Sequence, residues 1–532
     1  MQQLTYPTLY QINTRVYLGK LSRNRGTVST LDDIPECDLD ALAEKGFDWI
    51  WLLGVWQTGS VGWEQARSSS ALRREFQTLL PDFSEEDIVG SCFAVVDYSV
   101  HPDFGGDAAL ARLRARLNAK GIKLMLDFMP NHTAQDHPWV RQHPEFYVTG
   151  REEDLTQAPW NYARRDDSRG SLILAYGRDP NFPGWSDTFQ LNYGNPALQE
   201  AMIGALQKIA TRCDGVRCDM AMLILPEVFE RTWGIKAAPF WPKAIRAVRD
   251  AHPDFLLMAE VYWDLEWTLQ QQGFDYCYDK RLYDRLREGS VRLVREHLTA
   301  DLDFQNRLVR FLENHDEPRA AEAFPPEMHR AAAMITFFSP GLRFFHQGQL
   351  EGNQKRIPVQ LRRGPEEPLD EQIRDFYHRL LACLKDDVVC KGAWRLLETV
   401  AAWEGNDTFA HFIAYGWSRP DGARRWVVVN DAPYPGQCYL RLPFPELAGR
   451  IWRLQDRMGS AVYDRNGDDL LNTGLYLDLP AWGYHLFSID EPVPPPARSQ
   501  TRLSIQMRRN RNPKTKNDPT EERAGLPRVQ RG

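Results

Sequence analysis

The chain has 532 residues and a formal net charge of −7, with 43% hydrophobic and 26% charged residues. These values are typical of a globular protein with a sizeable core, and the length favours two or three domains. The mild acidity argues against a nucleic-acid partner, because phosphate binding depends on excess Lys and Arg. The start lacks the pattern of a secretory signal, and no stretch approaches the ~20 apolar residues of a membrane span. We therefore expect a cytoplasmic protein without a membrane partner.

The eight cysteines lie scattered along the chain, without the paired spacing of a metal site. Several fall inside predicted strands or helices. We therefore expect buried free thiols, as in a reducing compartment. The sequence points to no particular oligomeric state.

Strand and helix patterns alternate from the N-terminus to about residue 384. The predicted strands are short apolar runs at 10–17, 48–53, 122–128, 215–219, 255–260, 274–278, 309–312 and 342–345. Helical periodicity is clearest at 107–120, 196–212 and 370–384. In the first of these, Leu110, Leu113 and Leu117 share one face, and Gly121 is placed to end the helix. The alternation predicts a parallel sheet with right-handed crossovers, and eight such units fit a closed (β/α)8 TIM barrel.

Two long segments interrupt the barrel pattern. Residues 133–194 are polar, aromatic and rich in Pro and Gly, without clear helical periodicity. We expect them to form a small excursion domain over the barrel mouth, after the third strand. Residues 56–96 form a second insertion before the second barrel helix. Excursions at this face usually carry specificity, because loops there surround the site.

From about residue 393 the pattern changes to short strands separated by turn residues. Candidate strands are 408–415, 425–429, 437–441 and 484–488, with a turn at Arg465-Asn466-Gly467. This predicts an antiparallel β-sandwich ending near residue 490. A proline-rich break then leads into a basic, polar tail that we expect to be disordered, with contact to an acidic partner as the alternative. The predicted domains are a barrel (1–132 and 195–390), an excursion domain (133–194), a sandwich (391–490) and the tail (491–532).

Acidic, histidine and arginine side chains gather at the carboxyl ends of four predicted strands, the face where barrel enzymes place catalysis. These strands end in DFMPNH (127–132), GVRCD (215–219), MAE (258–260) and ENHD (313–316). A run of charged residues on the protein surface would not be confined to strand ends. Structural ion pairs are the alternative interpretation.

Two carboxyl groups in this set suit cleavage of a glycosidic bond with retention, which needs a pair about 5–5.5 Å apart. One must be ionised to attack the sugar, and the other must hold a proton for the leaving oxygen. Asp219 has Arg217 two residues away on the same strand face, and a cation lowers a carboxyl pKa, which suits the nucleophile. Glu260 follows an apolar run with no adjacent cation, which raises the pKa and suits the acid. Asp316, with His315, is placed to grip sugar hydroxyls.

These segments resemble the four sequence signatures of glycoside hydrolase family 13, the α-amylase family. DFMPNH, GVRCDMAM, MAEVYWD and FLENHDEP occur in the family's order and at its separations. DYSVHPDFGG (97–106) resembles the stretch ahead of the second barrel helix, and FQLNY (189–193) resembles a signature late in the excursion domain. The similarity covers about residues 6–490, and four ordered motifs are far more specific than one.

The resemblance implies roles for the residues of the four signatures. Asp219 would be the nucleophile, Glu260 the acid/base, and Asp316 the transition-state stabiliser. Arg217 would orient Asp219. The family therefore implies a retaining enzyme that acts on α-linked glucans.

The resemblance also implies substrate contacts around the cleaved sugar. His132 and His315 would bind that sugar, and Tyr98 would stack beneath it. Asp127 and Asn131 would hold the mouth together, and Asn131 matches a calcium ligand in many members. A structural hydrogen-bond pair is the alternative for these last two residues. We expect that no cofactor is required, with calcium as a possible ligand.

The chain departs from the family's pattern at two places. The family often has Lys-His three and four residues after the nucleophile, where this chain has Met222 and Leu223. The usual acceptor-side contact and one common calcium contribution are therefore missing. At the last strand the family's Gly-Gln/Asp-Glu appears as Gly348-Gln349, with Glu351 displaced. Neither change removes a catalytic group.

Several aromatic and histidine residues have two interpretations. Asp136-His137 and His143 lack metal-ligand spacing and favour loop contacts, and His346 lies near a strand end, where it can face the site. Five tryptophans suit either a sugar platform or the core: Trp56, Trp63, Trp160, Trp185 and Trp263.

Three functional classes are compatible with this pattern. The first is hydrolysis of α-linked glucans or malto-oligosaccharides. The second is transfer of the glycosyl group to a sugar or phosphate acceptor through the same covalent intermediate, as in a glucanotransferase or maltosyltransferase. The third is a non-catalytic sugar-binding protein on the same fold, since fold does not fix function. In each case the partner is an oligosaccharide or polysaccharide.

Overall fold

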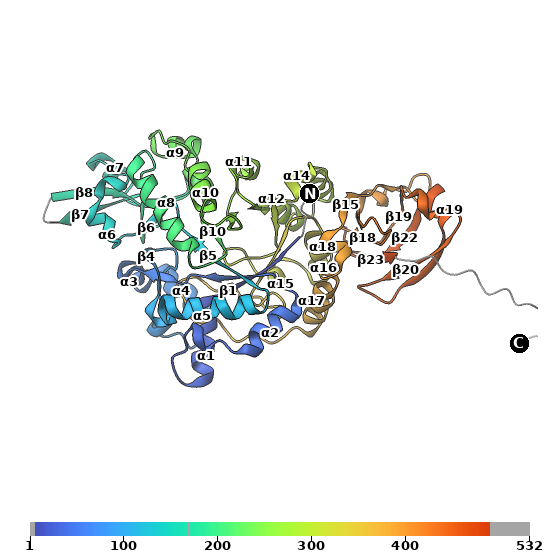
Figure 1. Ribbon diagram of the computed structural model, residues 1–532, viewed down its shortest axis with the longest axis horizontal. Coiled ribbons are helices and arrows are strands. Elements are labelled where there is room, and N and C mark those ends of the chain that lie inside the picture. Colours follow the sequence, from blue (N-terminus) through green and yellow to red (C-terminus); the bar gives the residue numbers. More distant parts are fainter. Residues whose placement is uncertain (1–5, 168–169, 490–532) are drawn as a thin grey trace, which may run out of the picture. The chain divides into compact units, whose positions relative to one another are not determined.

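Eight parallel strands form a closed barrel at the centre of the structure, a computed structural model that describes residues 6–167 and 170–489 (Figure 1). Neighbouring strands around the barrel are β1, β14, β13, β12, β11, β10, β5 and β2, all paired in parallel. Together with the antiparallel domain that follows, this architecture confirms the predicted fold class. The barrel strands are β1 (Thr8–Asn13), β2 (Trp49–Leu53), β5 (Lys123–Phe128), β10 (Gly215–Cys218), β11 (Leu256–Ala259), β12 (Tyr276–Tyr278), β13 (Leu308–Arg310) and β14 (Leu342–His346).

The first predicted strand is wrong at both ends. β1 begins at Thr8 and ends at Asn13, whose side chain accepts a hydrogen bond from the backbone N–H of Val16. Such a cap satisfies a free backbone donor at the start of a helix. Helix α1 (Thr14–Arg25) therefore begins where the sequence pattern predicted more strand.

Helices connect the barrel strands and surround the barrel (Figure 1). In α5 (Gly106–Ala119) the predicted leucine face is buried, and Gly121 follows with a φ of 78°, a conformation that favours glycine. The other helices around the barrel are α2 (Glu36–Lys45), α8 (Pro196–Ala210), α9 (Pro226–Trp233), α10 (Trp241–Arg249), α11 (Glu266–Gln271), α12 (Lys280–Arg287), α13 (Val291–Leu298), α14 (Leu302–Gln305), α15 (Ala320–Ala323), α16 (Pro326–Phe337), α17 (Glu371–Leu384) and α18 (Asp387–Lys391). Short 3-10 turns lie at η1 (Leu31–Asp33), η3 (Pro102–Phe104) and η5 (Ala221–Ile224).

The insertion at 56–96 has a small hydrophobic core of its own. Phe76, Leu80 and Ile88 pack there against Leu361, which comes from the long loop after β14. A backbone hydrogen bond of 2.8 Å from Val89 N to Gln360 O adds to this contact. The insertion and the loop therefore support each other. The elements of this region are β3 (Trp56–Thr58), α3 (Ser60–Ser68), α4 (Ser70–Leu79), η2 (Glu85–Asp87) and β4 (Val95–Val100).

The segment after β5 leaves the barrel and returns beside its own start. Its first strand, β6 (His132–Ala134), pairs antiparallel with its last, β9 (Thr188–Gln190). Leu191 N also donates to Asn131 O, so the two ends of the excursion are closed on each other. Between them lie α6 (Pro138–Gln142), η4 (Pro144–Phe146), α7 (Glu152–Gln157), β7 (Tyr162–Asp167) and β8 (Gly170–Ala175).

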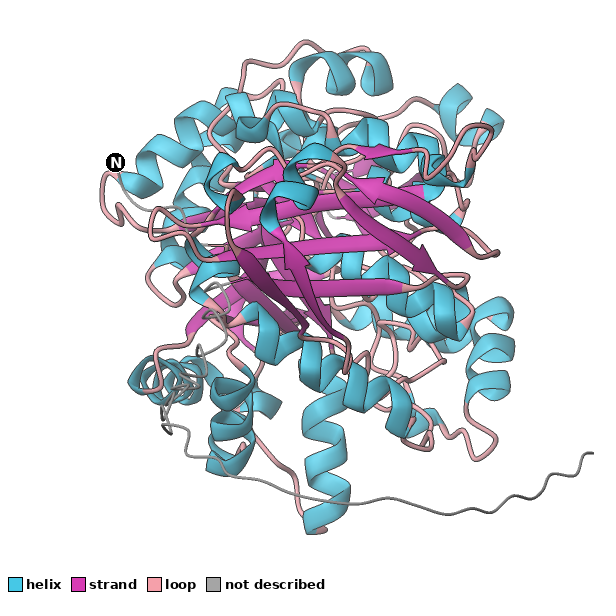
Figure 2. Cartoon of the chain, turned by 90° about the vertical axis from the view of Figure 1, so that its right-hand side faces the viewer, coloured by secondary structure: helices cyan, strands magenta, loops and turns pink. Residues whose placement is uncertain are grey.

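Antiparallel sheets of six and three strands follow the barrel (Figure 2). The larger has the order β15-β17-β18-β23-β20-β21 and the smaller β16-β19-β22. Their strands are β15 (Ala393–Leu396), β16 (Thr399–Val400), β17 (Phe412–Ser418), β18 (Arg424–Asn430), β19 (Gly436–Leu440), β20 (Ile451–Asp456), β21 (Val462–Asn466), β22 (Leu475–Leu479) and β23 (Tyr484–Ile489). The remaining short elements are η6 (Thr408–His411), η7 (Pro445–Leu447) and α19 (Gly467–Asn472).

Two details of the predicted sandwich are wrong. The strand predicted at 408–415 begins with the 3-10 turn η6, and extended structure starts only at Phe412. The predicted turn at Arg465-Asn466-Gly467 is instead the end of β21 and the start of α19. Asn466 caps that helix by accepting a hydrogen bond from Asp468 N. At the second place a side chain satisfies the backbone of a helix start, which a strand pattern does not reveal.

One hydrophobic core is shared by the barrel and one face of the larger sheet, and a second core lies within the sandwich itself. Trp417 and Tyr415 of β17 are fully buried, and both donate hydrogen bonds to backbone carbonyls at the end of α16. The Trp417 ring also contacts Tyr6, just before β1, with ring centroids 4.9 Å apart. The described residues accordingly fall within one compact unit. The predicted domain boundaries inside that unit stay predictions.

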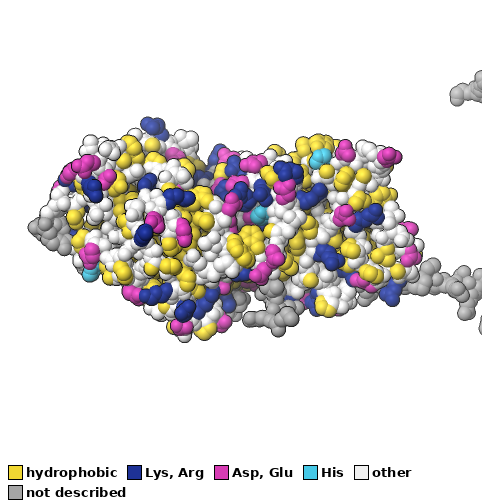
Figure 3. All heavy atoms as spheres, turned by 90° about the horizontal axis from the view of Figure 1, so that it is seen from above, with side chains coloured by type: hydrophobic (Ala, Val, Ile, Leu, Met, Phe, Trp, Pro, Cys, Tyr) yellow, Lys and Arg dark blue, Asp and Glu magenta, His cyan; other side chains and the backbone are white. Residues whose placement is uncertain are grey.

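The structure also bears on the expectations for the cysteines, for membrane-spanning helices and for the surface charge. All eight cysteines are free, but Cys37 is exposed and Cys383 and Cys390 are only partly buried. Within residues 6–167 and 170–489, no helix has the length and apolar character needed to cross a membrane. Acidic and basic side chains are interspersed on the face in Figure 3. The predicted tail at 491–532 lies outside the described residues.

Candidate active site

One cavity of about 320 Å³ at the carboxyl end of the barrel is lined by Asp219, Glu260 and Asp316. Asp219 directly follows β10, Glu260 directly follows β11, and Asp316 lies on the loop after β13. The structure therefore brings together the three carboxylates predicted from the sequence. Main-chain hydrogen bonds continue the barrel pairing to the first two, from Asp219 N to Phe128 O and from Glu260 N to Cys218 O. These bonds fix both positions on rigid backbone.

The guanidinium of Arg217 contacts two of these carboxylates. Its Nη1 lies 2.7 Å from Asp219 Oδ1 and its Nη2 lies 2.6 Å from Glu260 Oε2. Arg217 is fully buried, and Trp51 and Phe93 pack on its guanidinium at 5.5 and 5.3 Å. The expectation that Glu260 has no adjacent cation is therefore wrong. The cation comes from the neighbouring strand, a contact that the local sequence around Glu260 does not contain.

Burial controls the ionisation of both carboxyl groups. The pKa of Glu260 is raised to about 7, first by burial and also by the charge of Asp219, against the lowering effect of Arg217. Burial also raises the pKa of Asp219, although Arg217 opposes this. The lowered pKa expected for Asp219 is therefore wrong in net direction, because desolvation outweighs the cation. An ionised Asp219 still favours a protonated Glu260 beside it.

Glu260 has two further hydrogen-bond donors. Met220 N donates to its Oε2 at 2.7 Å, and the Tyr262 hydroxyl donates to its Oε1 at 2.9 Å. Met220 adopts a φ of 43°, a conformation uncommon for a residue with a side chain, and this aims its N–H at the carboxylate. Tyr262 was not predicted. Its position two residues after Glu260 was a signal, since alternate residues of an extended segment share a face.

Asp316 is held beside His315. His315 Nε2 lies 3.0 Å from Asp316 Oδ2, and its Nδ1 lies 3.0 Å from the Gln11 side-chain amide. With Gln11 as donor, Nδ1 accepts and Nε2 holds the proton toward Asp316. Desolvation at the cavity would raise the pKa of Asp316, although its side chain is 47% exposed, but His315 outweighs this effect and lowers the pKa to about 2. Asp316 is thus ionised, and Gln11 is a positioning residue that sequence reasoning missed.

Asp127 links the barrel strands beneath the cavity. It accepts hydrogen bonds from Trp51 Nε1 at 3.2 Å and from Gly54 N at 2.9 Å, and Arg217 Nη1 lies 3.9 Å away. Burial raises its pKa to about 6. These contacts fit the predicted role of Asp127 in holding the mouth together.

His132 and Tyr98 lie at a second, neighbouring cavity. His132 lines both cavities, and burial lowers its pKa to about 4, so it is neutral at pH 7. Tyr98 lines the second cavity alone, and its hydroxyl is bonded to the backbone N and O of Met129. Its ring packs on Trp56 at 5.7 Å. The sugar contacts of both residues stay predictions, with His132 the better placed.

The five tryptophans considered as sugar platforms lie in different environments in the structure. Trp185 lines the catalytic cavity, and its ring lies 5.2 Å from that of His132. Trp56 is buried, Trp160 is exposed, and Trp63 lines a different cavity. Trp263 is partly buried against the core.

The calcium contact of Asn131 stays a prediction. Its Oδ1 accepts a hydrogen bond of 2.9 Å from Gln190 Nε2, which leaves at most one lone pair of that oxygen for a cation. In the described part of the chain, no group of three or more His, Cys, Asp or Glu side chains is placed to hold a metal. The predicted loop role of Asp136 fits its contacts, since it accepts hydrogen bonds from Ser60.

The two departures from the family pattern have local explanations. Met222 and Leu223 lie in the turn η5 and are buried among apolar side chains. Gln349 donates to the Tyr377 hydroxyl at 2.9 Å, which anchors the loop after β14. Glu351 is exposed and lines a different cavity.

The protein is a (β/α)8 barrel. Its buried carboxylates lie at the carboxyl ends of the barrel strands, where barrel enzymes have their active sites. Residues 38–367 match the family model described as the α-amylase catalytic domain. The chain therefore belongs to glycoside hydrolase family 13, the α-amylase family.

Relatives in this family are distant and differ in activity. Alpha-amylase 3 of Dictyoglomus thermophilum is 24% identical over 54% of this chain and 58% of its own. The trehalose synthase/amylase TreS of Mycolicibacterium smegmatis is 27% identical over 45% of this chain and 44% of its own. A maltose-1-phosphate maltosyltransferase of Cereibacter sphaeroides is 24% identical over 48% of this chain and 36% of its own. The chain thus spans about half or less of these relatives.

The fold is also that of solved structures in this group. The maltogenic α-amylase AmyB of Thermotoga neapolitana superimposes with a TM-score of 0.65 at 19% identity, over 91% of this chain and 98% of that one. An α-amylase of Lactobacillus plantarum gives a TM-score of 0.63 at 20% identity, with the same coverage. Sequence identities this low support a similarity of fold alone.

Proposed function

We propose that the chain is a retaining α-glycosidase that acts on α-linked glucans or malto-oligosaccharides through a covalent intermediate on Asp219. The observation that carries this proposal is the single guanidinium of Arg217 between Asp219 and Glu260, with contacts of 2.7 and 2.6 Å. Two carboxyl groups bridged in this way lie close enough to act on one sugar ring. A retaining mechanism needs such a close pair, whereas an inverting one needs room for a water molecule between them.

The first step follows from the ionisation of the pair. Asp219 attacks the anomeric carbon as a carboxylate, while Glu260 gives its proton to the glycosidic oxygen, and the bond between that carbon and oxygen breaks. The pKa of Glu260 near 7 keeps this carboxyl largely protonated below neutral pH. Asp316 stays ionised beside His315 and is placed to accept hydrogen bonds from sugar hydroxyls.

The second step reverses these roles. Glu260, now ionised, removes a proton from water, and the resulting oxygen attacks the anomeric carbon and releases Asp219. Donation from Met220 N and Tyr262 stabilises Glu260 in this charged state. The two inversions restore the original configuration at the anomeric carbon.

Transfer to an acceptor other than water is the second candidate function. It is favoured by the buried Met222 and Leu223, which replace the polar pair of many members and change the acceptor side. Relatives named as trehalose synthase/amylase and as maltosyltransferase also support it. The catalytic residues are the same for both functions.

Incubation with maltoheptaose, with and without phosphate, separates the candidates. Shorter sugars alone indicate hydrolysis, and longer sugars or a sugar phosphate indicate transfer. No change in the substrate would contradict both. Asp219→Asn and Glu260→Gln should each lower turnover by about 10²–10⁴-fold or more without loss of the fold, measured by circular dichroism.

A further inference from the structure

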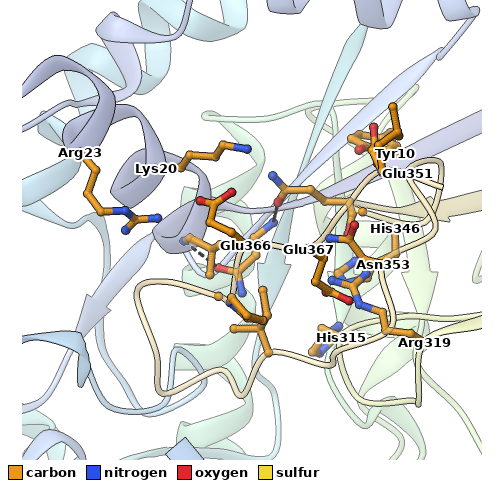
Figure 4. Close-up of a pocket in the computed structure, with 18 residues that line it drawn as sticks. Tyr10, Lys20, Arg23, His315, Arg319, His346, Glu351, Asn353, Glu366 and Glu367 are labelled. Atoms are coloured by element: carbon orange, nitrogen blue, oxygen red, sulfur yellow. Dashed lines mark hydrogen bonds between the residues drawn. The ribbon is translucent and has the colours of Figure 1, made fainter. Parts of the chain in front are cut away.

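Two faces of helix α1 border different cavities. In the cavity of about 300 Å³ that Figure 4 shows, cations of the helix are accompanied by glutamates of the loop after β14: Lys20, Arg23, Glu366 and Glu367. The other cavity, of about 590 Å³, is lined by the helix face that carries Arg15, Gly19 and Ser22. It shares no described lining residue with the catalytic cavity. A cavity of this volume suits a small molecule.

The larger cavity contains a buried cation without a counter-ion. Arg15 is 6% exposed. Its Nη1 donates to Gly90 O at 2.6 Å and its Nη2 donates to Thr58 Oγ1 at 3.0 Å, and both acceptors are neutral. Within residues 6–167 and 170–489, no carboxylate forms an ion pair with this guanidinium. A buried charge is costly unless an opposite charge pairs with it, so the cavity favours an anion.

Three further donors line the same cavity. Ser29 is 2% exposed, and its Oγ forms no hydrogen bond with the part of the chain that the structure describes. His101 Nδ1 accepts a hydrogen bond of 3.2 Å from Asp103 N, which leaves Nε2 to carry the proton of the neutral ring. Arg362 is exposed and, like Arg15, has no acidic partner among the described residues. The cavity therefore offers donors that its own chain does not use.

The acidic residue of this lining does not neutralise the two arginines. The Asp103 side chain is 78% exposed, and its Oδ2 lies 3.7 Å from His101 Nδ1. The pKa of His101 is lowered, first by burial and also by the charge of Arg15, against the raising effect of Asp103. The ring is therefore neutral at pH 7 and lies near the buried guanidinium. The lining keeps a net positive charge, whereas glutamates accompany the cations in the cavity of Figure 4.

Apolar side chains complete the walls. Leu18 comes from α1, Trp63 from α3 and Phe104 from η3. Trp63 Nε1 already donates to Ile88 O at 3.0 Å, so this residue offers its ring rather than its donor. An organic group attached to the anion would lie against these walls.

We propose that this cavity binds a phosphate group, either free or as part of an ester whose organic part lies against the apolar walls. Arg15 would form the charged contact at the inner end, and Ser29, His101 and Arg362 would donate to the remaining oxygens. A phosphate group offers at least three acceptor oxygens, whereas a carboxylate offers two, so four donors match a phosphate better. The proposal is independent of the catalytic function.

The test is a calorimetric titration of inorganic phosphate, phenyl phosphate and benzoate into the full chain. A double variant carries Ser29→Ala with Arg362→Ala, which removes two donors and leaves the buried Arg15 in place. The matched control carries Ser68→Ala with Lys355→Ala, an exposed serine and an exposed lysine that do not line the cavity. A further variant, Arg15→Gln, removes the buried charge itself. Circular dichroism checks that each variant is folded.

We expect one site for phenyl phosphate, with an affinity that falls about tenfold in the double variant and is unchanged in the control. A folded Arg15→Gln protein should bind more weakly still. Tighter binding of phenyl phosphate than of inorganic phosphate would identify an ester as the occupant, and equal binding would identify free phosphate. Equal affinity of the double variant and the control, no binding of either phosphate, or equally tight binding of benzoate would overturn the proposal.

Discussion

The ionisation states of Glu260 and Asp219 predict how the activity depends on pH. Glu260 has its pKa raised by burial to about 7, and the proposed mechanism needs it protonated. We therefore expect kcat/KM to fall as the pH rises through about 7. The raised pKa of Asp219 adds a fall at acidic pH, because the nucleophile must be ionised. A pH profile of kcat/KM on maltoheptaose measures both limbs, and full activity well above pH 8 would contradict the assignment of Glu260.

The second prediction at this scale concerns metal. Asn131 Oδ1 is already bonded to Gln190, so we expect EDTA to leave activity and stability unchanged. The measurement is the rate and the melting temperature before and after chelation. Strong inactivation that added calcium reverses would show that the bond to Gln190 gives way to a cation.

Much of the site could be predicted at the scale of residues, because Asp219 and Glu260 directly follow short strands and Asp316 lies on the loop after another. Contacts between side chains on different strands could not be predicted. The bond between Gln11 and His315 joins residues that are 304 positions apart. The contact of Arg217 with Glu260 spans two neighbouring strands. Their effect on ionisation depends on burial, which a local pattern does not measure.

At the scale of elements, the insertion at 56–96 and the loop after β14 form one wall of the catalytic cavity. Arg363 of the loop bonds Asp87 Oδ1 at 2.6 Å and Asp82 Oδ1 at 2.9 Å, both from the insertion. The same loop brings Val359 and Gln360 into the cavity. The sequence predicted the insertion but not its partner, because the two segments are far apart in the chain.

The third prediction tests this wall. Arg363→Ala removes the charged contacts that tie the loop carrying Gln360 to the insertion, so we expect KM for maltoheptaose to rise about fivefold, the equivalent of about 1 kcal/mol. kcat should change less, since no catalytic carboxyl moves. Arg374→Ala is the control, because Arg374 is exposed and pairs only with its neighbour Asp375 among the described residues. Equal KM values for the two variants would show that this wall of the cavity does not contribute to substrate binding.

For the whole molecule, the shared core implies that the barrel and the sandwich unfold together. Trp417 is fully buried at their contact, and its Nε1 donates to Phe338 O at 2.8 Å. We expect Trp417→Ala to cost about 3–5 kcal/mol. Trp403→Ala is the matched control, because Trp403 is 56% exposed. Thermal unfolding followed by calorimetry should show one transition at a lower temperature for Trp417→Ala. A separate early transition of the sandwich alone would contradict a shared core.

The proposed mechanism requires a covalent bond between Asp219 and the sugar. A ring-fluorinated α-glycosyl fluoride tests it most directly, since the fluorine slows both steps and the fluoride leaving group accelerates the first. After incubation, peptide mass spectrometry locates the added sugar. We expect a single glycosyl group on the peptide that contains Asp219, and none in Asp219→Asn. Labelling of another residue, or turnover with an inverted product and no labelling, would contradict it.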